Sequence, residues 1–557
     1  MDLLFYPLVL AALLLPVIWV GRRHTDHVET LALAAGYGVL GAAAIGLARF
    51  FVALPASTPR LAGLLAFGLC VVAAVILWKV AASSRGGVAI QRSDTPARRS
   101  GAVQRIRVSL LLAVVSAALI SVGIEASLPH YDLAERYYDW FVHFDLARVF
   151  HAATAADLGR HWGEATVTTR TPLYNLVGSL ALTYLGDRLA VFQVFTAAVA
   201  WLWILPFALL ARRLVGGWAP AVTALAGLSP LVLHTTTYAS SKGLVTFFAL
   251  LALERYLALR EAPAKSVTSL SWQFGLFSAA TVMTHSGFLG FPLALFALFA
   301  WDTLRRRRRW RDLLLSTSIA ALVAIPWYVW AIAQYGLRAG VFGYPHAPYD
   351  SVLRWAFDRF LILPTSLLPL TLPLDRYVAH PIETYFLVFI GTATGLLGVA
   401  YLLRALAQNL NRRTRIRAGS LEAPVLWFAA GGILVADLLH EGVVSNNAGT
   451  FCVPGLLVLM LLALRANPLT RAFLIVSLVE TIAFELAVLW WAWSPAGGGR
   501  PNALVAQANH LRFLGQDTLP IGIILLIAGI VLAVVCVWPH IRAQAEAPSR
   551  ASSPAAA

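Results

Sequence analysis

The chain of 557 residues is 59% hydrophobic and only 13% charged, with a mean hydropathy of +0.73. Its apolar runs repeatedly reach the roughly 17–25 residues that a helix needs to cross a bilayer. The runs are continuous, which excludes a membrane barrel because barrel strands alternate apolar and polar residues. The expected fold is an all-α polytopic membrane protein.

The net charge of +16 does not indicate a nucleic-acid partner, because the basic residues lie in short loops between apolar runs and form no single surface. Cys70, Cys452 and Cys536 are far apart within or beside apolar runs, so neither a disulfide framework nor a metal site is predicted from them. The expected partner on these grounds is the lipid bilayer.

The apolar runs predict about 15 crossings. Met1–Val20 lacks a basic start and a small-residue cleavage site, so we expect a retained span and not a signal peptide. The predicted spans lie near 4–20, 30–53, 62–82, 107–127, 188–211, 217–234, 240–258, 270–284, 287–301, 313–334, 382–405, 422–440, 449–465, 470–492 and 518–538.

The positive-inside rule orients these spans, because short loops rich in Lys and Arg stay on the cytoplasmic side. All the basic loops share one side only if the stretch 270–301 folds as two short helices that turn at Thr284–Gly287. Two long loops, 128–187 and 335–381, then face outward. The basic segments concerned are Arg22–Arg23, 85–107, Arg212–Arg213, 255–265, 305–309 and 412–417.

The chain divides into four expected parts. These are N-terminal spans with a basic cytoplasmic loop at 1–106, a membrane core at 107–335 that contains the first outer loop, a second outer loop with C-terminal spans at 336–541, and a disordered tail at 542–557.

A helix predicted over 131–150 carries the main candidate site. It places Glu135, Asp139 and His143 one above another on one face, with aromatic residues largely on the other side. Such a helix is suited to lie in the membrane interface. A carboxylate beside a histidine is a candidate general base. The alternative is that these residues are only the solvated face of an interfacial helix.

Other acids of this helix have local cations. Asp132 can reach Arg136, and Asp145 can reach Arg148, whereas Glu135, Asp139 and His143 have no cation within the helix. An acid that is not already neutralised is the better candidate base.

Two cations are candidate phosphate-binding residues. Arg170 precedes a short apolar segment of about 13 residues from Leu173, too short to cross, which predicts a surface or re-entrant helix. Lys242 stands at the outer end of a span beside two serine hydroxyls and near a helix N-terminus, where anions bind well. The alternative for each is an interfacial anchor that snorkels to the headgroups.

Further candidate substrate contacts lie in outer turns and loops. His285 is at the turn between two short helices, where a structural role is the alternative. Arg338, Tyr344 and His346 belong to a loop whose Gly, Pro and aromatic content suits a cover that stacks on sugar.

The order of these features resembles the GT-C superfamily of membrane glycosyltransferases, in particular protein O-mannosyltransferases and aminoarabinose lipid A transferases. The resemblance covers about 107–335 and rests on "DWFVHFDLA", "RTPLYNLVGSLALTYLGD", "LAGLSPLVLHTTTYASSKGLVTFFALLALERYLALR" and "MTHSGFLG". Trp140 replaces the Glu of the family's Asp-Glu pair, and Thr171 replaces the first Pro of its PPL-type motif.

The resemblance implies a GT-C-like helical bundle that transfers a sugar, hexosyl or pentosyl, from a polyprenyl-phosphate carrier to a glycan, lipid or protein acceptor. It implies Asp139 as the general base, with Asp132 or Asp145 as reserves, and Lys242 and Arg170 as phosphate contacts. No cofactor is required by this chemistry, although a divalent cation, Mg²⁺ or Mn²⁺, is compatible with it. The expected location is a bacterial inner membrane, with the site on the periplasmic or extracellular face.

Two other functions fit the same sequence. An O-antigen polymerase or ligase would use pyrophosphate-linked donors, and a flippase or other transporter of lipid-linked glycans would form no covalent product. The donor and the product therefore discriminate among the three.

Overall fold

The computed structural model describes residues 26–54, 56–83, 98–127, 138–152, 166–228, 241–263, 266–305, 308–342, 421–439, 452–466 and 519–546, with a few shorter pieces elsewhere. Helices account for nearly all of this part of the chain, and the described strands are the two-residue pair β1 (Arg512–Phe513) and β2 (Gln516–Asp517). The predicted spans 382–405 and 470–492 fall almost wholly outside it.

The first half of the chain supplies most of the bundle. Its helices are α2 (His27–Ala53), α3 (Thr58–Ser83), α4 (Arg98–Ser127), α5 (Tyr138–Ala152), η1 (Val167–Thr169), α7 (Leu173–Leu185), α8 (Leu189–Ala200), η2 (Trp201–Trp203), α9 (Ile204–Val215), η3 (Gly216–Trp218) and α10 (Ala219–Gly227).

The helices that follow are α12 (Lys242–Glu261), α13 (Val267–Thr284), η4 (Ser286–Phe288), α14 (Gly290–Leu304), α15 (Trp310–Phe342), α20 (Glu422–Leu439), α22 (Val453–Ala466) and α25 (Leu519–Glu546). The predicted pair of short helices is confirmed, because α13 and α14 are separated by a turn at His285–Leu289. The predicted 13-residue helix from Leu173 is confirmed as α7.

Six helical stretches of the described residues are long and apolar enough to cross a membrane. They are His27–Ala53, Arg107–Ala126, Leu189–Gly227, Ser286–Leu304, Trp310–Val341 and Pro520–Ala543, and shorter apolar helices include α7, α20 and α22. The chain is thus an all-α polytopic membrane protein, and the count of about 15 crossings stays a prediction. The predicted start of the disordered tail, residue 542, is too early, because α25 continues to Glu546. Adding residues to the end of an existing helix costs little free energy.

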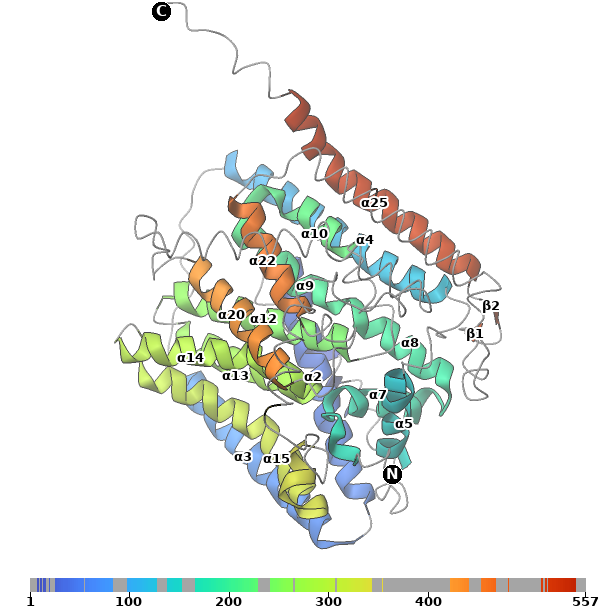
Figure 1. Ribbon diagram of the computed structural model, residues 1–557, viewed down its shortest axis with the longest axis vertical. Helices are drawn as coiled ribbons and strands as arrows, with labels where there is room; N and C mark the ends of the chain where they lie inside the picture. Colours follow the sequence, from blue (N-terminus) through green and yellow to red (C-terminus); the bar gives the residue numbers. More distant parts are fainter. Residues whose placement is uncertain are drawn as a thin grey trace, which may run out of the picture.

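The bundle is arranged around α12, which is buried along almost its whole length, and α2 packs against α7, α9, α3 and α4 (Figure 1). The helices α12, α13 and α15 pack side by side, α3 packs along α15, and α4 lies against both α10 and α25. Close approach of α4 and α25 depends on small residues, since the Ser116 hydroxyl donates to the Gly529 carbonyl at 2.7 Å. The short helices α5 and α7 lie together beside α2.

A network of buried ion pairs lies at one end of the bundle. Arg255 pairs with Glu254 on its own helix and with Glu29 of α2 at 2.9 Å. Arg213 of α9 pairs with Glu254 at 3.1 Å, and Arg212 pairs with Asp26. The start of α2 and the ends of α9 and α12 therefore meet on one side, as the positive-inside argument requires.

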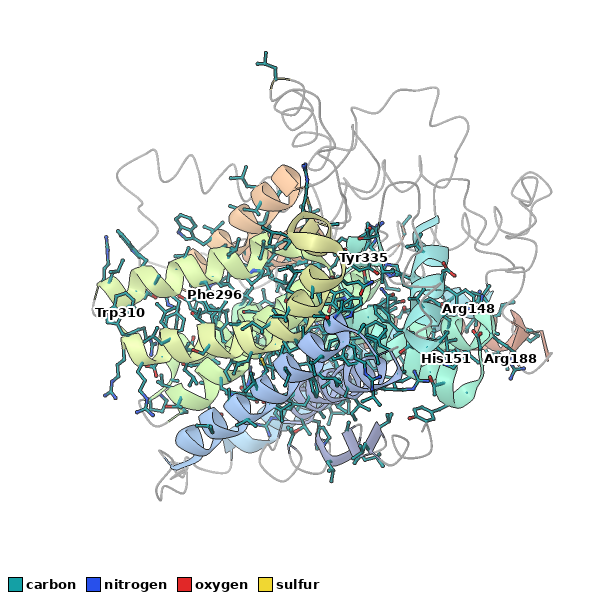
Figure 2. All side chains as sticks on the ribbon, turned by 90° about the horizontal axis from the view of Figure 1, so that it is seen from below. Arg148, His151, Arg188, Phe296, Trp310 and Tyr335 are labelled. Atoms are coloured by element: carbon teal, nitrogen blue, oxygen red, sulfur yellow. The ribbon has the colours of Figure 1, made fainter. Side chains whose placement is uncertain are left out.

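The loop after α14 joins the same end, because Arg308 donates to the Arg260 carbonyl and Arg260 pairs with Asp302 at 3.3 Å. Figure 2 shows Trp310, at the start of α15, at the opposite edge of the molecule from Arg148, His151 and Arg188. Arg148, His151 and Arg188, which belong to or border the predicted first outer loop, thus lie at the opposite edge of the molecule from the residue that follows the basic segment 305–309.

Candidate functional site

Two equivalent hydrogen bonds join α5 to α7. The His143 Nδ1 and Asn175 Oδ1 atoms are 2.9 Å apart, and His151 Nδ1 is 2.9 Å from Thr183 Oγ1. Each pair spans 32 residues of sequence, and the second lies about two turns further along both helices. The helices α5 and α7 therefore run parallel in a fixed register.

This register brings two predicted site residues to the same height along the bundle. Asp139 lies in the first turn of α5, one turn before His143. The corresponding step back from Asn175 reaches Thr171, which directly follows Arg170. The start of α5, with its candidate base, is thus level with the candidate phosphate-binding arginine.

His143 does not lie on an exposed polar face, so the predicted orientation of this helix is wrong at that position. Its side chain is only 2% exposed, and its ring contacts the Tyr174 ring edge-on at a centroid distance of 5.1 Å. An amide acceptor on α7 offsets the cost of burying the imidazole. The Asp139 side chain and all of Glu135, Tyr344 and His346 lie outside the described residues, so their predicted roles stay predictions.

Arg148 does not pair with Asp145, contrary to the local pairing expected from their spacing. Its Nε atom donates to Asp187 at 3.1 and 3.2 Å, across the end of α7. Asp145 is buried at 7% exposure. The partner comes from a distant segment because α7 packs parallel to α5 and brings its C-terminal end beside Arg148, and helical spacing within α5 alone does not report that.

Glu125 is a buried acid at this height that the sequence analysis did not select. It lies near the end of α4, is 1% exposed, and accepts a hydrogen bond from Thr196 at 3.1 Å. Burial, and secondarily the Glu125 carboxylate, raise the pKa of the Tyr174 phenol well above its usual value. An acid within an apolar run is costly and marks a functional position by default, which is the signal that could have identified it.

The helices α7 and α8 form an antiparallel hairpin. The Tyr174 ring lies 5.3 Å from the Phe195 ring, and the Phe192 ring packs against Gly178. Because the two helices are antiparallel, Arg170, four residues before Tyr174, is level with the end of α8 near Ala200.

Lys242 lies beside the same point of α8. It is the first residue of α12 and is 5% exposed. A Cβ at the next residue, Gly243, would overlap the Ala200 carbonyl oxygen, so the two backbones touch here. Lys242, the first residue of α12, and Arg170, three residues before α7, thus come to a common height next to the end of α8.

His285 reaches this height from α13. The helices α12 and α13 are antiparallel, because Arg255 donates to Gln273 at 3.4 Å and the Phe248 ring stacks on Phe277 at 6.3 Å. Continuing this register places the end of α13 level with Lys242. The His285 Nδ1 atom accepts from the Gly287 amide at 3.2 Å, and the role of this residue in binding substrate stays a prediction.

Arg338 is brought back toward the site by a reversal in α15. Gly336 adopts φ 78° and ψ 169°, a conformation that L residues rarely adopt, and the chain folds back so that Gly340 touches the Ala331 backbone. The Thr168 hydroxyl of η1 donates to the Ala339 carbonyl. The exposed Arg338 therefore belongs to a segment in contact with the one that carries Arg170.

The site so assembled combines cations from three elements with acids from two others. Within the described residues, no group of three or more His, Cys, Asp or Glu side chains could hold a metal ion. An acid or base beside fixed positive charges suits binding and departure of a phosphate.

Comparison with known proteins gives matches to structures only. No protein-family model and no curated protein matches the chain. The fold is similar to the crystal structure of ArnT from Cupriavidus metallidurans bound to undecaprenyl phosphate, with 14% sequence identity, a TM-score of 0.45, and coverage of 81% of this chain and 79% of that one.

It is also similar to the archaeal oligosaccharyltransferase AglB from Archaeoglobus fulgidus in complex with an inhibitory peptide and a dolichol-phosphate. There the identity is 13%, the TM-score 0.40, and the coverage 78% of this chain and 56% of that one. Both structures are GT-C membrane glycosyltransferases, the superfamily that the sequence resembles. At these identities the likeness concerns the fold alone.

The paired histidines of α5 allow a matched test of the register. We expect His143→Ala to lower the free energy of unfolding by about 1–3 kcal/mol and to reduce the activity of the candidate site, because it leaves the Asn175 amide buried without its partner beside the site. His151→Ala removes the equivalent bond at a partly buried position away from the site, and we expect a smaller loss of stability and near-normal activity. Equal activity of the two variants would contradict a positioning role for His143.

Proposed function

We propose that this protein is a membrane glycosyltransferase that moves a sugar from a polyprenyl-phosphate carrier to a cell-envelope glycan, lipid or protein acceptor. The observation that carries the proposal is the common height of Asp139, Arg170 and Lys242, which three separate helix contacts support. The membrane concerned is a bacterial inner membrane, and the reaction takes place at its periplasmic or extracellular face.

In the proposed reaction Asp139 accepts the proton of an acceptor hydroxyl as its oxygen attacks the anomeric carbon. The bond from that carbon to the carrier phosphate oxygen breaks on the opposite side, so the configuration inverts. Arg170 and Lys242 stabilise the negative charge that the departing lipid phosphate gains. Because the leaving group is already a phosphate, the reaction needs no nucleotide, and Mg²⁺ or Mn²⁺ is not required for it.

Burial distinguishes Lys242 from an interfacial anchor. An ammonium group at 5% exposure costs free energy unless an anion or another acceptor compensates it. An interfacial anchor would keep its charge in water, so the snorkelling alternative is disfavoured for this lysine.

The proposal is tested by measuring transfer of radiolabelled sugar from a polyprenyl-phosphate donor to cell-envelope acceptors. Arg170→Met and Lys242→Met are expected to reduce the rate by about 10²–10³-fold, because each removes a charge that stabilises the leaving phosphate. Arg188→Met removes an exposed cation from the start of α8 and is the matched control, with transfer expected to stay within twofold of wild type.

Two outcomes would replace the proposal. Transfer from pyrophosphate-linked oligosaccharides alone would identify a polymerase or ligase. Movement of a lipid-linked glycan across vesicles without any covalent product would identify a transporter.

A further inference from the structure

A cavity of about 240 Å³ lies within the helices at one side of the proposed site. Its walls come from α2, α3, α7, α13 and α15, and every lining side chain is aliphatic, aromatic, proline, methionine or cysteine. A cavity with such walls stays dry and binds apolar molecules; one of about 150 Å³ already holds benzene. The space is therefore suited to part of a hydrocarbon chain.

Two of the walls are helices that the family resemblance does not include. Ala43 and Ala44 of α2 and Phe67 and Cys70 of α3 line the cavity, whereas the resemblance begins near residue 107. Without α2 and α3, the facing sides of α13 and α15 would be open to the surrounding lipid. The N-terminal helices thus convert an apolar helix surface into a partly open apolar chamber.

The chamber lies next to the segment that carries the proposed phosphate site. Pro172 and Leu173 line it at the start of α7, and Arg170 lies two residues earlier in the same segment. The helix α7 separates the two environments, since Leu176 lines the cavity while Asn175 bonds to His143 on α5. A molecule that consists of a phosphate and an attached apolar chain could place the phosphate at Arg170 and the chain in the cavity.

The chamber can be entered from the membrane region. Val71 lines it and is also 47% exposed on α3, and Ala44 is exposed on α2. An opening between two lipid-facing helices admits a chain laterally and needs no passage through the polar end of the bundle.

We propose that α2 and α3 complete a binding chamber for the hydrocarbon chain of the lipid-phosphate donor. This inference rests on the proposed function, because the donor is the ligand whose phosphate Arg170 would hold. The chamber binds the chain in the ground state and the transition state alike, so it acts on donor affinity and not on the chemical step.

The first experiment needs no variant. Purified full-length protein in nanodiscs is photolabelled with a diazirine-bearing isoprenyl phosphate, and the labelled peptides are identified by mass spectrometry. Labels on the cavity-lining parts of α2 and α3, displaced by unlabelled isoprenyl phosphate but not by excess phosphatidylglycerol, support the proposal. Labels elsewhere, or equal displacement by phosphatidylglycerol, would show a general lipid surface and overturn it.

The second experiment fills the chamber. Ala44→Trp is expected to abolish labelling of the chamber and to raise the KM for the long-chain donor about tenfold with kcat nearly unchanged. Leu69→Trp is the matched control, because Leu69 lies on α3 at 70% exposure and does not line the cavity. An unchanged KM in folded Ala44→Trp protein would overturn the chamber.

The outcomes separate this inference from the proposed function. Specific chamber labelling in a wild-type protein that transfers no sugar would remove the transferase and keep the chain-binding site. Normal transfer with no effect of Ala44→Trp and no chamber labelling would keep the transferase and remove the site.

Discussion

Asp139→Asn is expected to reduce sugar transfer by about 10²–10⁴-fold, the range that loss of a general base produces. The amide keeps the size of the side chain but cannot accept the proton of the acceptor hydroxyl. The register of α5 on α7 is fixed by the His143–Asn175 bond, one turn after Asp139, so the substitution changes the chemistry and leaves the helix register intact. The rate is measured with the radiolabelled polyprenyl-phosphate donor at saturating concentration, and donor affinity is measured separately.

Two controls make this result specific. Asp187→Asn removes an acid that pairs with Arg148 at the far end of α7, and transfer is expected to stay near the wild-type rate. Asp145→Asn tests the reserve candidate on the same helix. Undiminished transfer by Asp139→Asn would remove Asp139 from the mechanism, and loss in Asp145→Asn alone would assign the base to that residue.

The family's second acid is absent from its usual place, where this chain has Trp140. A carboxylate nevertheless reaches the same height from α4, since Glu125 bonds to Thr196 and is near Tyr174. The acid is contributed by a different helix and is buried, and Thr196 donates a hydrogen bond to its Oε1 atom.

The sequence predicts the helices of this protein better than the faces that they bury. Apolar length and charge bias lead to α13 and α14 as two short helices, because a continuous helix would place the arginines after Leu304 on the wrong side. The α7 helix follows from a short apolar segment that begins after a proline. These arguments depend only on the bilayer and on local backbone chemistry.

The contacts of the outer loop could not be predicted in the same way. The partner of His143 is an amide 32 residues later, and the partner of Arg148 is Asp187. Both contacts follow from the parallel packing of α5 on α7. The spacing of residues within either helix does not predict which residues of the other helix it will meet. Helical spacing correctly groups Asp139 with His143 but does not tell whether that face meets water or protein.

The position of Arg338 could not be predicted either, because it depends on the backbone conformation of Gly336. The apolar pattern through 313–334 predicts the span. The chain then reverses at Gly336, so that the following residues lie against η1. Glycine is compatible with a reversal there, and it is equally compatible with a loop that leads away. Only the contact between Thr168 and Ala339 distinguishes the two.

Arg255→Met is expected to cost the largest loss of stability among the ion-pair residues, about 3–5 kcal/mol. The Arg255 and Glu254 side chains are 3% and 5% exposed, so removal of the guanidinium leaves a carboxylate buried beside Glu29 with less compensation. The loss is measured as the free energy of reversible unfolding in detergent. Arg465→Met is the matched control, because its pair with Glu422 is 37% and 33% exposed, and its cost is expected not to exceed about 1 kcal/mol.

The double variant Arg255→Met with Glu254→Gln separates two causes of that loss. If the cost arises from the uncompensated carboxylate, neutralising Glu254 recovers a large part of it, because an apolar or neutral replacement of a whole buried pair is often tolerated. If the cost arises from lost packing of the arginine stem, the double variant stays as unstable as Arg255→Met. Since Arg255 joins α12 to α2 and α13, and α12 carries Lys242 at its other end, recovery of stability should be accompanied by recovery of donor binding.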